Sequence, residues 1–372
     1  MSRVAVEAAF AAAAPTAAIR RPQLSLIGTG TVGSAFVARW QQLTQRGLVL
    51  PRLAALANSR GVVACGEDTA DALRTVNLAR GEAPTGFALP HPHPGDIVVD
   101  ATASDVVASQ HAQWLARGVH VVTANKLGHG ADLLRAQAIA RAQREGGTRY
   151  GDAATVGAGL PLLRSIRELV AGGDRIHAVE GVLSGSLAWL FDRYDGMRPF
   201  SGFVREARDA GYTEPDPRLD LSGEDVRRKL LILARAAGLA LEAHEVVVDS
   251  LVPDKLAQAE DADVDARLAA LDAPLRERFK AAWRDAARLR FVGRFDAGHD
   301  AACRASVGLR ALPAGHALCG GSGTDNRVAI FSDRYRKQPL VIQGPGAGAE
   351  VTAAALVDDV LRIAPAGDRS NG

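Results

Sequence analysis

The sequence predicts an α/β protein of two domains: a doubly wound parallel sheet followed by an α+β domain. Two observations predict this order. Short apolar runs alternate with helical patterns as far as Tyr150, which is typical of parallel strands joined by crossover helices. After Tyr150 this alternation stops, and helical segments precede runs with strand-like patterns. A chain of 372 residues is long enough for two such cores.

The first predicted strand, residues 24–27, leads through a glycine-rich turn into a helix. Gly28, Gly30 and Gly33 follow the spacing G-x-G-x-x-G. The first glycine permits a tight turn, the second lets the backbone approach a pyrophosphate at the helix N-terminus, and the third lets helix and strand pack closely. Because a strand precedes the motif and a helix follows it, the pattern favours a Rossmann-type dinucleotide-binding domain over a turn without a ligand.

The second predicted strand, residues 53–57, ends in Asn58-Ser59-Arg60. A strict NAD fingerprint places an acidic residue here to bind the ribose 2′-hydroxyl, and this chain has none. Arg60 can instead accept a 2′-phosphate, so NADP is favoured. Since Arg60 can equally be a solvated loop residue, NAD stays open as the alternative.

Two further predicted strands bring polar residues to the same sheet edge. The strand at 96–100 is followed by Thr102 and Ser104, and the strand at 119–122 by Lys126, with a helix at 106–117 between the strands. Ligands of doubly wound sheets bind at the carboxyl ends of the strands. We therefore expect Lys126 to point into the cofactor crevice. A lysine that directly follows a buried strand is less often a solvent-exposed residue without a role than a lysine on a helix is.

The second domain is predicted over 151–343. A Gly/Ala-rich connector reaches a helix that starts at Pro161. The remaining predicted elements are helices from 185 and at 201–210, 225–237 and 254–288, and strands at 175–182, 290–295, 304–312, 326–332 and 340–343. A last helix at 351–361 follows a glycine-rich loop and is expected to return to the first domain, so that 344–365 complete residues 23–150. Residues 1–22 are predicted to be a mobile tail.

Residues 210–229 carry the densest group of charged side chains. Ser222 is expected to cap a helix in a capping-box arrangement with Asp225, which places Asp225 and Lys229 four residues apart on one helical face. Pro215 and Pro217 are expected to hold the carboxylates at 214, 216 and 220 in a rigid, non-helical stretch. Such a segment can grip a small zwitterion. The competing interpretation is a solvated helix start with an ordinary surface ion pair.

Composition narrows the class of protein. The formal net charge is +2, from 44 basic and 42 acidic residues, and no basic block indicates a nucleic-acid partner. No apolar run reaches membrane-spanning length. Cys65, Cys303 and Cys319 are far apart and lack CxxC spacing, so they are expected to be free thiols in a reducing cytoplasm. Residues 1–22 lack the features of a secretory signal.

With these pieces placed, the sequence resembles the homoserine dehydrogenase family over about residues 23–365. The pattern from Ala207 to Lys229 matches the family signature, and four further stretches look like the family. These stretches are VTANK at 122–126, ATVGAGLP at 154–161, GVLSGSLAWLF at 181–191 and PLVIQGPGAGAEVTA at 339–353.

The resemblance implies interconversion of L-homoserine and L-aspartate 4-semialdehyde with NADP or NAD, in threonine and methionine biosynthesis. It implies that Lys229 is the proton donor, that Asp225 and Lys126 share the catalytic site, and that Glu214 holds the substrate amino group. Other residues fall on positions that contact ligands in the family. For the substrate they are Asp220, Gly185, Ser186 and Tyr212, and for the cofactor Thr31, Val32, Thr102, Ser104, Lys126 and Gly346, beside the three motif glycines and Arg60.

The resemblance also implies a monovalent-cation site, such as for sodium, on the backbone carbonyls of Val156, Ala158 and Leu160. Ala153 stands where the family usually has a glutamate at that site, and Leu219 replaces a frequent aspartate. We expect a homodimer, with a pair of dimers as the alternative, and with residues near 290–340 at the contact. With neither a kinase portion nor a C-terminal extension in the sequence, feedback by threonine through a regulatory domain is not expected.

The alternative left open is another NAD(P)-dependent amino-acid or semialdehyde dehydrogenase of the same architecture. An aldehyde dehydrogenase that acts through a thiohemiacetal would need a cysteine on a crevice loop, and none of the three cysteines lies in the matched motifs. A nucleotide-sensing protein without activity would predict the loss of Glu214, Lys229 or Lys126, and all three are present.

Overall fold

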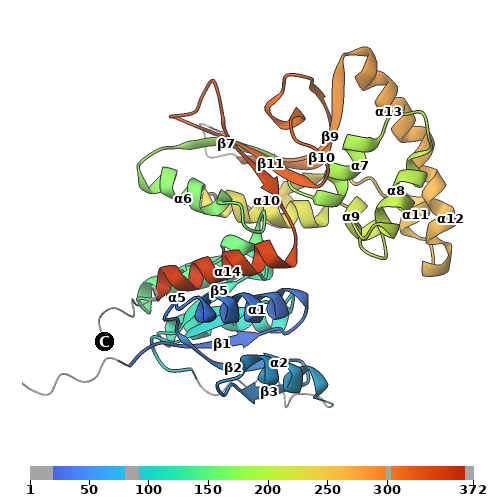
Figure 1. The fold of residues 1–372 in the computed structure, drawn as a ribbon. Helices are drawn as coiled ribbons and strands as arrows, with labels where there is room; N and C mark the ends of the chain where they lie inside the picture. The colour runs from blue at the N-terminus through green and yellow to red at the C-terminus, as the bar shows by residue number, and fades with distance from the viewer. Residues whose placement is uncertain (1–19, 80–91, 299–302, 365–372) are drawn as a thin grey trace, which may run out of the picture.

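The computed structural model describes residues 20–79, 92–298 and 303–364. Two lobes, each built on a six-stranded sheet, follow each other along the chain (Figure 1). Apart from residues 20–22, the tail predicted for 1–22 lies outside the described residues. Arg20, at its end, is held by a two-pronged ion pair with Asp96. Within the described ranges, no helix has the length and apolarity to cross a membrane.

The sheet of the first lobe has the strand order β3-β2-β1-β4-β5-β6. Its strands are β1 (Gln23–Ile27), β2 (Arg52–Asn58), β3 (Gly61–Ala64), β4 (Ile97–Asp100), β5 (His120–Thr123) and β6 (Tyr150–Gly151). All neighbours pair in parallel except β2 and β3. The prediction missed β3, which pairs back onto β2 because Asn58 Oδ1 accepts hydrogen bonds from the amides of Arg60 and Gly61 and closes a tight turn.

Helices cover both faces of this sheet. They are α1 (Thr31–Gln45), α2 (Thr69–Leu78), α3 (Asp105–Ala116), α4 (Leu127–Gly130), α5 (Leu133–Glu145) and α14 (Ala349–Ile363). The last helix, α14, lies beside α1 (Figure 1), and Leu356 and Val360 pack into one apolar cluster with Leu24 and Phe36. The C-terminal helix thus packs on the lobe that holds the glycine turn. These observations confirm the α/β class and the doubly wound, largely parallel sheet.

The second sheet has the order β12-β11-β7-β9-β10-β8 and is antiparallel except where β8 joins β10. Its strands are β7 (Ile176–Val182), β8 (Val246–Val248), β9 (Ala287–Ala297), β10 (Cys303–Pro313), β11 (Asp325–Ser332) and β12 (Leu340–Pro345). The sequence did not reveal β8, a run of three valines too short to show a period. The sheet still confirms the predicted α+β second domain.

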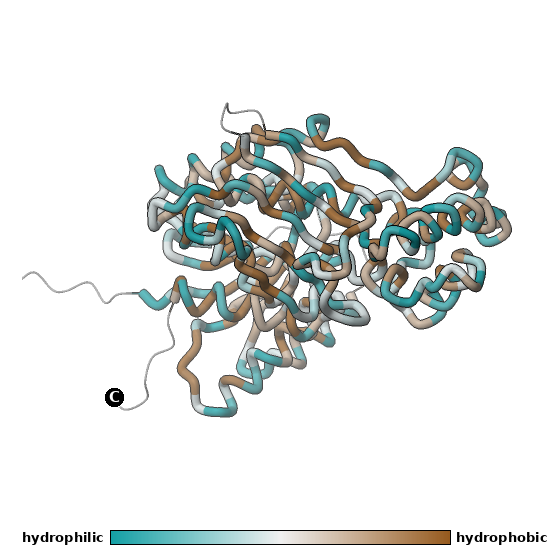
Figure 2. Tube along the Cα trace, turned by 90° about the horizontal axis from the view of Figure 1, so that it is seen from above, coloured by the Kyte–Doolittle hydropathy of each residue, from teal (hydrophilic) through white to brown (hydrophobic). Residues whose placement is uncertain are grey.

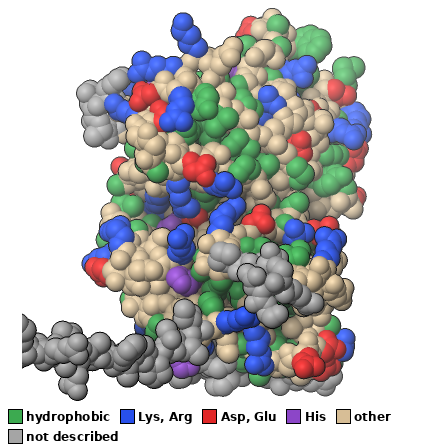
Figure 3. Space-filling view, turned by 60° about the vertical axis from the view of Figure 1, so that its left-hand side comes forward, with side chains coloured by type: hydrophobic (Ala, Val, Ile, Leu, Met, Phe, Trp, Pro, Cys, Tyr) green, Lys and Arg blue, Asp and Glu red, His purple; other side chains and the backbone are tan. Residues whose placement is uncertain are grey.

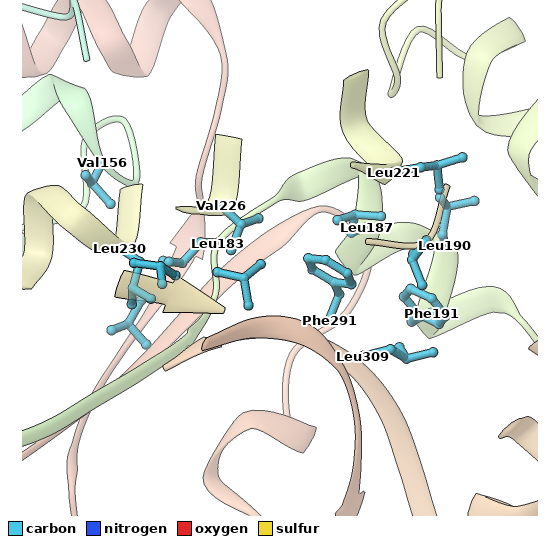
Figure 4. Close-up of a cluster of buried hydrophobic side chains, with 14 of the residues drawn as sticks. Val156, Leu183, Leu187, Leu190, Phe191, Leu221, Val226, Leu230, Phe291 and Leu309 are labelled. Carbon is cyan, nitrogen blue, oxygen red and sulfur yellow. The ribbon is translucent and has the colours of Figure 1, made fainter. Parts of the chain in front are cut away.

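The helices of the second lobe are α6 (Leu162–Ala171), α7 (Gly185–Arg193), α8 (Phe200–Asp209), α9 (Arg218–Leu221), α10 (Glu224–Ala236), α11 (Asp254–Ala257), α12 (Val264–Arg267) and α13 (Asp272–Arg284), with short 3₁₀ turns η1 (Ala153–Thr155), η2 (Ala243–Glu245), η3 (Asp261–Asp263), η4 (Leu268–Leu271) and η5 (Ala317–Cys319). Figure 2 shows hydrophilic residues along the outer coils of the chain and hydrophobic stretches between them. The core joins α7 and α10 to the sheet through Leu187, Leu230 and Phe291 (Figure 4).

Four local predictions were wrong. The expected helix at 254–288 is broken into α11, α12 and α13, and Pro161 is the residue before α6 rather than its first residue. The stretch from Glu214 to Asp220 is not wholly non-helical, because α9 begins directly after Pro217. Ser222 does not cap α10. Gly223 precedes that helix with φ of 80°, a left-handed conformation that glycine adopts freely, and this sharp turn separates α9 from α10.

Candidate active site

A cavity of about 610 Å³ opens between the lobes at the carboxyl edge of the first sheet. Residues of both lobes line it, from the glycine turn through the loops after β4 and β5 to α10 and the loop before α14. Charged side chains gather along the level where the lobes meet (Figure 3). Seven predicted site residues share this one cavity, namely Thr31, Val32, Thr102, Lys126, Ala158, Lys229 and Gly346.

The glycine turn has the geometry that a pyrophosphate site requires. Gly28 has φ of 94°, and a Cβ there would lie 2.8 Å from the carbonyl oxygen of Ala101. A Cβ on Gly33 would overlap the Gly28 carbonyl, so α1 can approach β1 only with glycine at this position. No atom lies within 4 Å of the Cβ position of Gly30, which leaves open space at the N-terminus of α1 for an anionic ligand.

Asp100, which the sequence analysis did not single out, organises the loop after β4. It is fully buried, and its Oδ1 accepts hydrogen bonds from the amide and hydroxyl of Thr102. His111 contacts the other carboxylate oxygen at 3.0 Å and the hydroxyl of Tyr150 at 3.0 Å. Burial, and then the carboxylates of Asp152 and Asp100, raise the pKa of Tyr150, so its hydroxyl stays protonated. Asp100 ends an apolar strand, and this signal is too common to have identified it.

The loop after β5 is tied to the loop after β4. The amide nitrogen of Asn125 donates to the Ser104 carbonyl at 2.9 Å and to the Thr102 hydroxyl at 3.3 Å. Its oxygen accepts from the amide of Leu127, the first residue of α4. Ser104 caps α3 by accepting from the amide of Val107. These bonds fix Lys126, which directly follows Asn125, at the wall of the cavity.

Lys229 is the most buried cation of the site, with its side chain 10% exposed. Its Nζ lies 2.8 Å from Asp225 Oδ2 and donates to the carbonyl oxygen of Leu183 at 2.8 Å. Lys126 contacts the other oxygen of Asp225 at 3.4 Å. One carboxylate therefore holds two ammonium groups from different lobes. Because an ammonium has three N–H donors, Lys229 keeps one for a ligand.

The protonation state of Asp225 follows from these contacts. Burial raises the pKa of its carboxyl, but the ammonium of Lys229 and then that of Lys126 outweigh burial and hold this pKa well below its usual range. Asp225 is therefore a carboxylate at neutral pH. The i,i+4 spacing predicted from the sequence is present on α10, and Lys229 of this pair lines the cavity.

A second group of polar residues adjoins Leu183 but does not line this cavity. Ser184 and Ser186 share a hydrogen bond of 2.8 Å, and Ser186 donates to Asp220 Oδ1 at 2.6 Å. The other oxygen of Asp220 accepts from the backbone amide of Glu214 at 2.9 Å, while the Glu214 side chain stays exposed. Gly185 lies between the serines, at the start of α7.

Three other residues that the sequence analysis considered lie outside this polar group, and each has different contacts. Asp216, which the sequence grouped with Glu214, is instead bound by Arg218, which also donates to the Ala259 carbonyl. Tyr212 is 45% exposed and packs on Trp189 with a ring distance of 5.4 Å. Arg60 lies far along the chain from these residues, exposed in the turn between β2 and β3.

Backbone carbonyl groups near Ala158 are candidate cation ligands, although Ala153 stands where the family usually has a glutamate. Val156 and Ala158 are buried, and Ala158 has φ of 50°, which is rare for a residue with a side chain. Among the described residues no donor contacts the carbonyl of either residue, whereas the Leu160 carbonyl accepts from the amide of Leu162. Buried backbone carbonyls are normally paired, so two free ones are candidate ligands for a bound cation.

Other features are placed away from the cavity. The three cysteines are free thiols and none lines it, which removes the thiohemiacetal alternative. Over the described ranges, no cluster of His, Cys, Asp and Glu side chains could hold a metal ion. A larger cavity of about 1010 Å³ lies between α13, the start of β9 and the loop after α7, and it contains no predicted site residue.

Comparison with known proteins identifies the family. A family model described as homoserine dehydrogenase matches residues 161–361, and one described as the NAD-binding domain of homoserine dehydrogenase matches residues 28–151. The chain is 34% identical over 365 residues to a homoserine dehydrogenase of Emericella nidulans, covering 91% of this chain and 97% of that protein. A crystal structure of a Candida auris protein superposes with a TM-score of 0.79 at 34% identity, covering 93% of this chain and 99% of that one.

The relatives also include much longer proteins. A chloroplastic bifunctional aspartokinase/homoserine dehydrogenase of Zea mays is 43% identical over 275 residues, which are 74% of this chain but 30% of that protein. This chain therefore spans about a third of the length of such relatives. The fold, the glycine turn and the matches over both lobes lead to one conclusion: the chain belongs to the homoserine dehydrogenase family.

Proposed function

We propose that this chain interconverts L-homoserine and L-aspartate 4-semialdehyde by hydride transfer with NADP or NAD, in the pathway towards threonine and methionine. The observation that carries the proposal is the position of Lys229. This buried ammonium, held by Asp225, lines the same cavity as the residues around the glycine turn. A proton donor beside a dinucleotide site is what reduction of an aldehyde to an alcohol requires.

In the reducing direction, a cofactor held at the glycine turn would supply the hydride that the carbonyl carbon accepts. Lys229 donates its third N–H to the aldehyde oxygen, and the product is the alcohol. Asp225 and the Leu183 carbonyl hold the Lys229 nitrogen in place. After donating its proton Lys229 is a neutral amine, and in the oxidising direction this amine accepts the hydroxyl proton and becomes the ammonium again. Lys126, whose side chain is 35% exposed, shares the carboxylate of Asp225 and neutralises charge near the cofactor.

The substrate's amino-acid end is assigned to the polar group beside Leu183. Glu214 faces the ammonium of the substrate, and Asp220, Gly185 and Ser186 shape the site around it. Tyr212 covers it from the exposed side. The support is the chain of hydrogen bonds from Ser184 through Ser186 and Asp220 to the amide of Glu214, which fixes the Glu214 backbone.

For the cofactor we propose NADP as the preferred form. The end of β2 offers the exposed guanidinium of Arg60 and no carboxylate, because the side chain there is Asn58, which is buried and engaged in the turn. An archaeal homoserine dehydrogenase of the same fold has been solved in complex with NADPH. Residues 23–150, completed by 344–365, would bind the cofactor, and 151–343 would supply catalysis and dimerisation.

Two further features belong to the proposal. The free carbonyls of Val156 and Ala158, with that of Leu160, would hold a monovalent cation such as sodium, which would brace the junction between the lobes. A homodimer would form through the second sheet. Its face away from α10 carries partly buried apolar side chains around Val182 and Val292, namely Leu312, Phe331 and Val341, which a second copy could cover.

A direct assay tests the proposal. Purified protein is expected to reduce NADP with L-homoserine and to consume NADPH with L-aspartate 4-semialdehyde. Alcohols without the amino group should react poorly, because Glu214 would then lack its partner. If neither direction shows turnover while another amino-acid alcohol or semialdehyde does, the substrate assignment is wrong.

A further inference from the structure

We propose that Asn326 is a positioning residue for Lys229, acting through the carbonyl oxygen of Leu183. No motif of the sequence indicated this residue. Its amide nitrogen donates to the Leu183 oxygen at 3.2 Å, and Lys229 Nζ donates to the same oxygen at 2.8 Å. One backbone oxygen is therefore shared by two donors from different elements, β11 and α10. The kinetic part of the test below rests on the proposed function, and the spectroscopic part does not.

The burial of Asn326 shows that its side chain is fixed. Asn326 is fully buried and is the second residue of strand β11, next to the segment that joins β7 to α7. Within the described residues its Oδ1 has no hydrogen-bond partner. Leaving a buried amide oxygen unpaired costs roughly 1–3 kcal/mol, so a residue of no function would be expected to be apolar here. The hydrogen bond from its nitrogen to Leu183 is the contact that can offset this cost.

Gly346 closes the site over this amide. A Cβ on Gly346 would overlap the Cγ, Oδ1 and Nδ2 of Asn326, so only glycine lets the loop after β12 lie against it. Because Gly346 also lines the cavity, the amide stands directly behind the cavity wall. The loop holds Asn326 in the orientation in which its nitrogen meets Leu183.

The Leu183 carbonyl is held from the other side by the core. The Leu183 side chain is fully buried and lies among Val226 and Leu230 of α10 (Figure 4). Packing fixes the position of the residue, but the direction of its carbonyl depends on the two donors. Without Asn326 the peptide can rotate, and Lys229 then keeps only Asp225 as a fixed partner. A misdirected proton donor slows the chemical step with little effect on ground-state binding.

The first test follows the NMR signal of the Lys229 side chain. The chain has lysines at five positions, 126, 229, 255, 280 and 337. Labelling with [ε-¹³C]lysine therefore gives a simple spectrum, in which loss of one signal in Lys229→Ala assigns that residue. We expect the Lys229 signal to move in Asn326→Ala at constant pH, while the signal of exposed Lys255 stays in place. An unmoved Lys229 signal would overturn the proposal.

The second test is a double-mutant cycle on kcat with L-homoserine. Asn326→Ala is expected to lower kcat about tenfold, the loss of one hydrogen bond near a charged group, with the KM for NADP within about twofold of wild type. In the Lys229→Ala background the same change should lower kcat less than about twofold, because the group it positions is gone. Equal effects in both backgrounds would overturn the proposal.

A matched control comes from the same strand. Ser332, at the other end of β11, is also fully buried and donates to Asp174 at 3.0 Å. Ser332→Ala should lower the melting temperature without moving the Lys229 signal. If Asn326→Ala does not fold, Asn326→Ser carries the test, and failure of both to fold would assign Asn326 to stability and overturn the proposal. A wild-type protein without homoserine turnover refutes the proposed function, while the spectrum still decides the role of Asn326.

Discussion

At the residue scale, the charged side chains of the candidate site differ in how deeply they are buried and in how many fixed contacts they make. Asp225 binds Lys229 and Lys126 at once and is kept ionised by both, so the two lysines cannot be treated as independent. Lys229 is much less exposed than Lys126 and has the more directional contacts. This difference, which no sequence pattern gives, favours Lys229 as the group that moves the proton.

Arg60 offers a test of cofactor choice at the scale of one residue. Arg60→Ala removes the guanidinium proposed to meet the 2′-phosphate, so the KM for NADP should rise roughly tenfold and that for NAD should stay nearly constant. Steady-state kinetics with both cofactors measure this. Arg117→Ala, at the exposed C-terminal end of α3, is the control and should change neither value. Equal NADP affinity in wild type and Arg60→Ala would refute the assignment.

Glu214 offers a test of substrate binding. Glu214→Gln keeps the side-chain volume but removes the charge proposed to face the substrate ammonium. The KM for L-homoserine should rise roughly tenfold, with a smaller change in kcat. Glu206→Gln removes an exposed carboxylate that pairs with Arg198 and should leave the KM unchanged. An unaltered kcat/KM in Glu214→Gln would remove this residue from the substrate site.

At the residue scale, the sequence predicted the groups that lie in motifs and missed those that act through packing. One cavity contains the predicted residues Thr31 and Val32 of the glycine motif, Thr102, Lys126 and Lys229. Asp100, Asn125 and Asn326 were not predicted, because each owes its contacts to residues distant in sequence or to the backbone. A buried amide or carboxylate looks like any other polar residue until its partners are known.

At the scale of elements, the lobes are joined where β6 leads into η1 and α6. Asp152, just after β6, is 1% exposed and binds Arg167 of α6 through both oxygens, at 2.5 and 2.7 Å. His129 of α4 contacts it at 2.8 Å. Burial raises the pKa of Asp152, but Arg167 and then His129 outweigh burial and hold it well below its usual range. The ion pair thus clamps α4, β6 and α6 together.

This clamp predicts a stability effect with a definite pH dependence. Asp152→Asn should lower the free energy of unfolding by about 2 kcal/mol at pH 7, less than for a fully buried pair because Arg167 is 41% exposed. A lowered pKa stabilises the fold above the unfolded value near 4, and this stability is lost as pH falls towards the folded value. The gap between wild type and variant should therefore narrow below about pH 4.

Urea unfolding at several pH values measures this gap. Asp71→Asn is the control, since Asp71 is 67% exposed in its pair with Arg74 and should contribute less than about 0.5 kcal/mol. A gap that stays constant down to pH 3, or that is no larger than the gap of the control, would contradict the clamp.

Elements with a clear period or a motif at their boundary were predicted within one to four residues, as for α3, α8 and β11. The failures have a common cause. β3 and β8 are short strands that depend on a neighbour for their pairing, and α9 is a single turn between Pro217 and the left-handed Gly223. Local sequence cannot show such elements, because tertiary contacts decide them.

At the scale of the whole molecule, the partly buried apolar face of the second sheet predicts that two copies of the chain form a dimer. On its face away from α10, Leu318 of η5 and Ala188 of α7 pack in one cluster with Val182 and Val292, while Phe331 and Val341 stay partly buried. Light scattering should give twice the chain mass of 39.0 kDa. Phe331→Lys, on this face, should weaken the dimer, and Trp283→Ala on α13, 73% exposed, should not. An active monomer at micromolar concentration would refute the dimer.

The two lobes matter to function because neither forms the cavity alone. The glycine turn, Thr102 and Lys126 come from the first lobe, and Lys229 comes from the second. The overall architecture was predictable because a fingerprint, a strand pattern and a family signature all agree with it. The distance between the lobes could not be predicted from the sequence, because contacts such as that of Lys126 with Asp225 join residues about a hundred positions apart.

The most direct test of the central claim is the kinetics of Lys229→Ala. The account predicts that kcat with L-homoserine falls by roughly 10²–10⁴-fold, because the proton acceptor is lost, while NADPH binding followed by fluorescence stays at the wild-type level. Lys255→Ala, an exposed lysine on α11, is the control and should retain full activity. Turnover by Lys229→Ala equal to that of wild type would contradict the assignment of Lys229 as the group that exchanges a proton with the substrate.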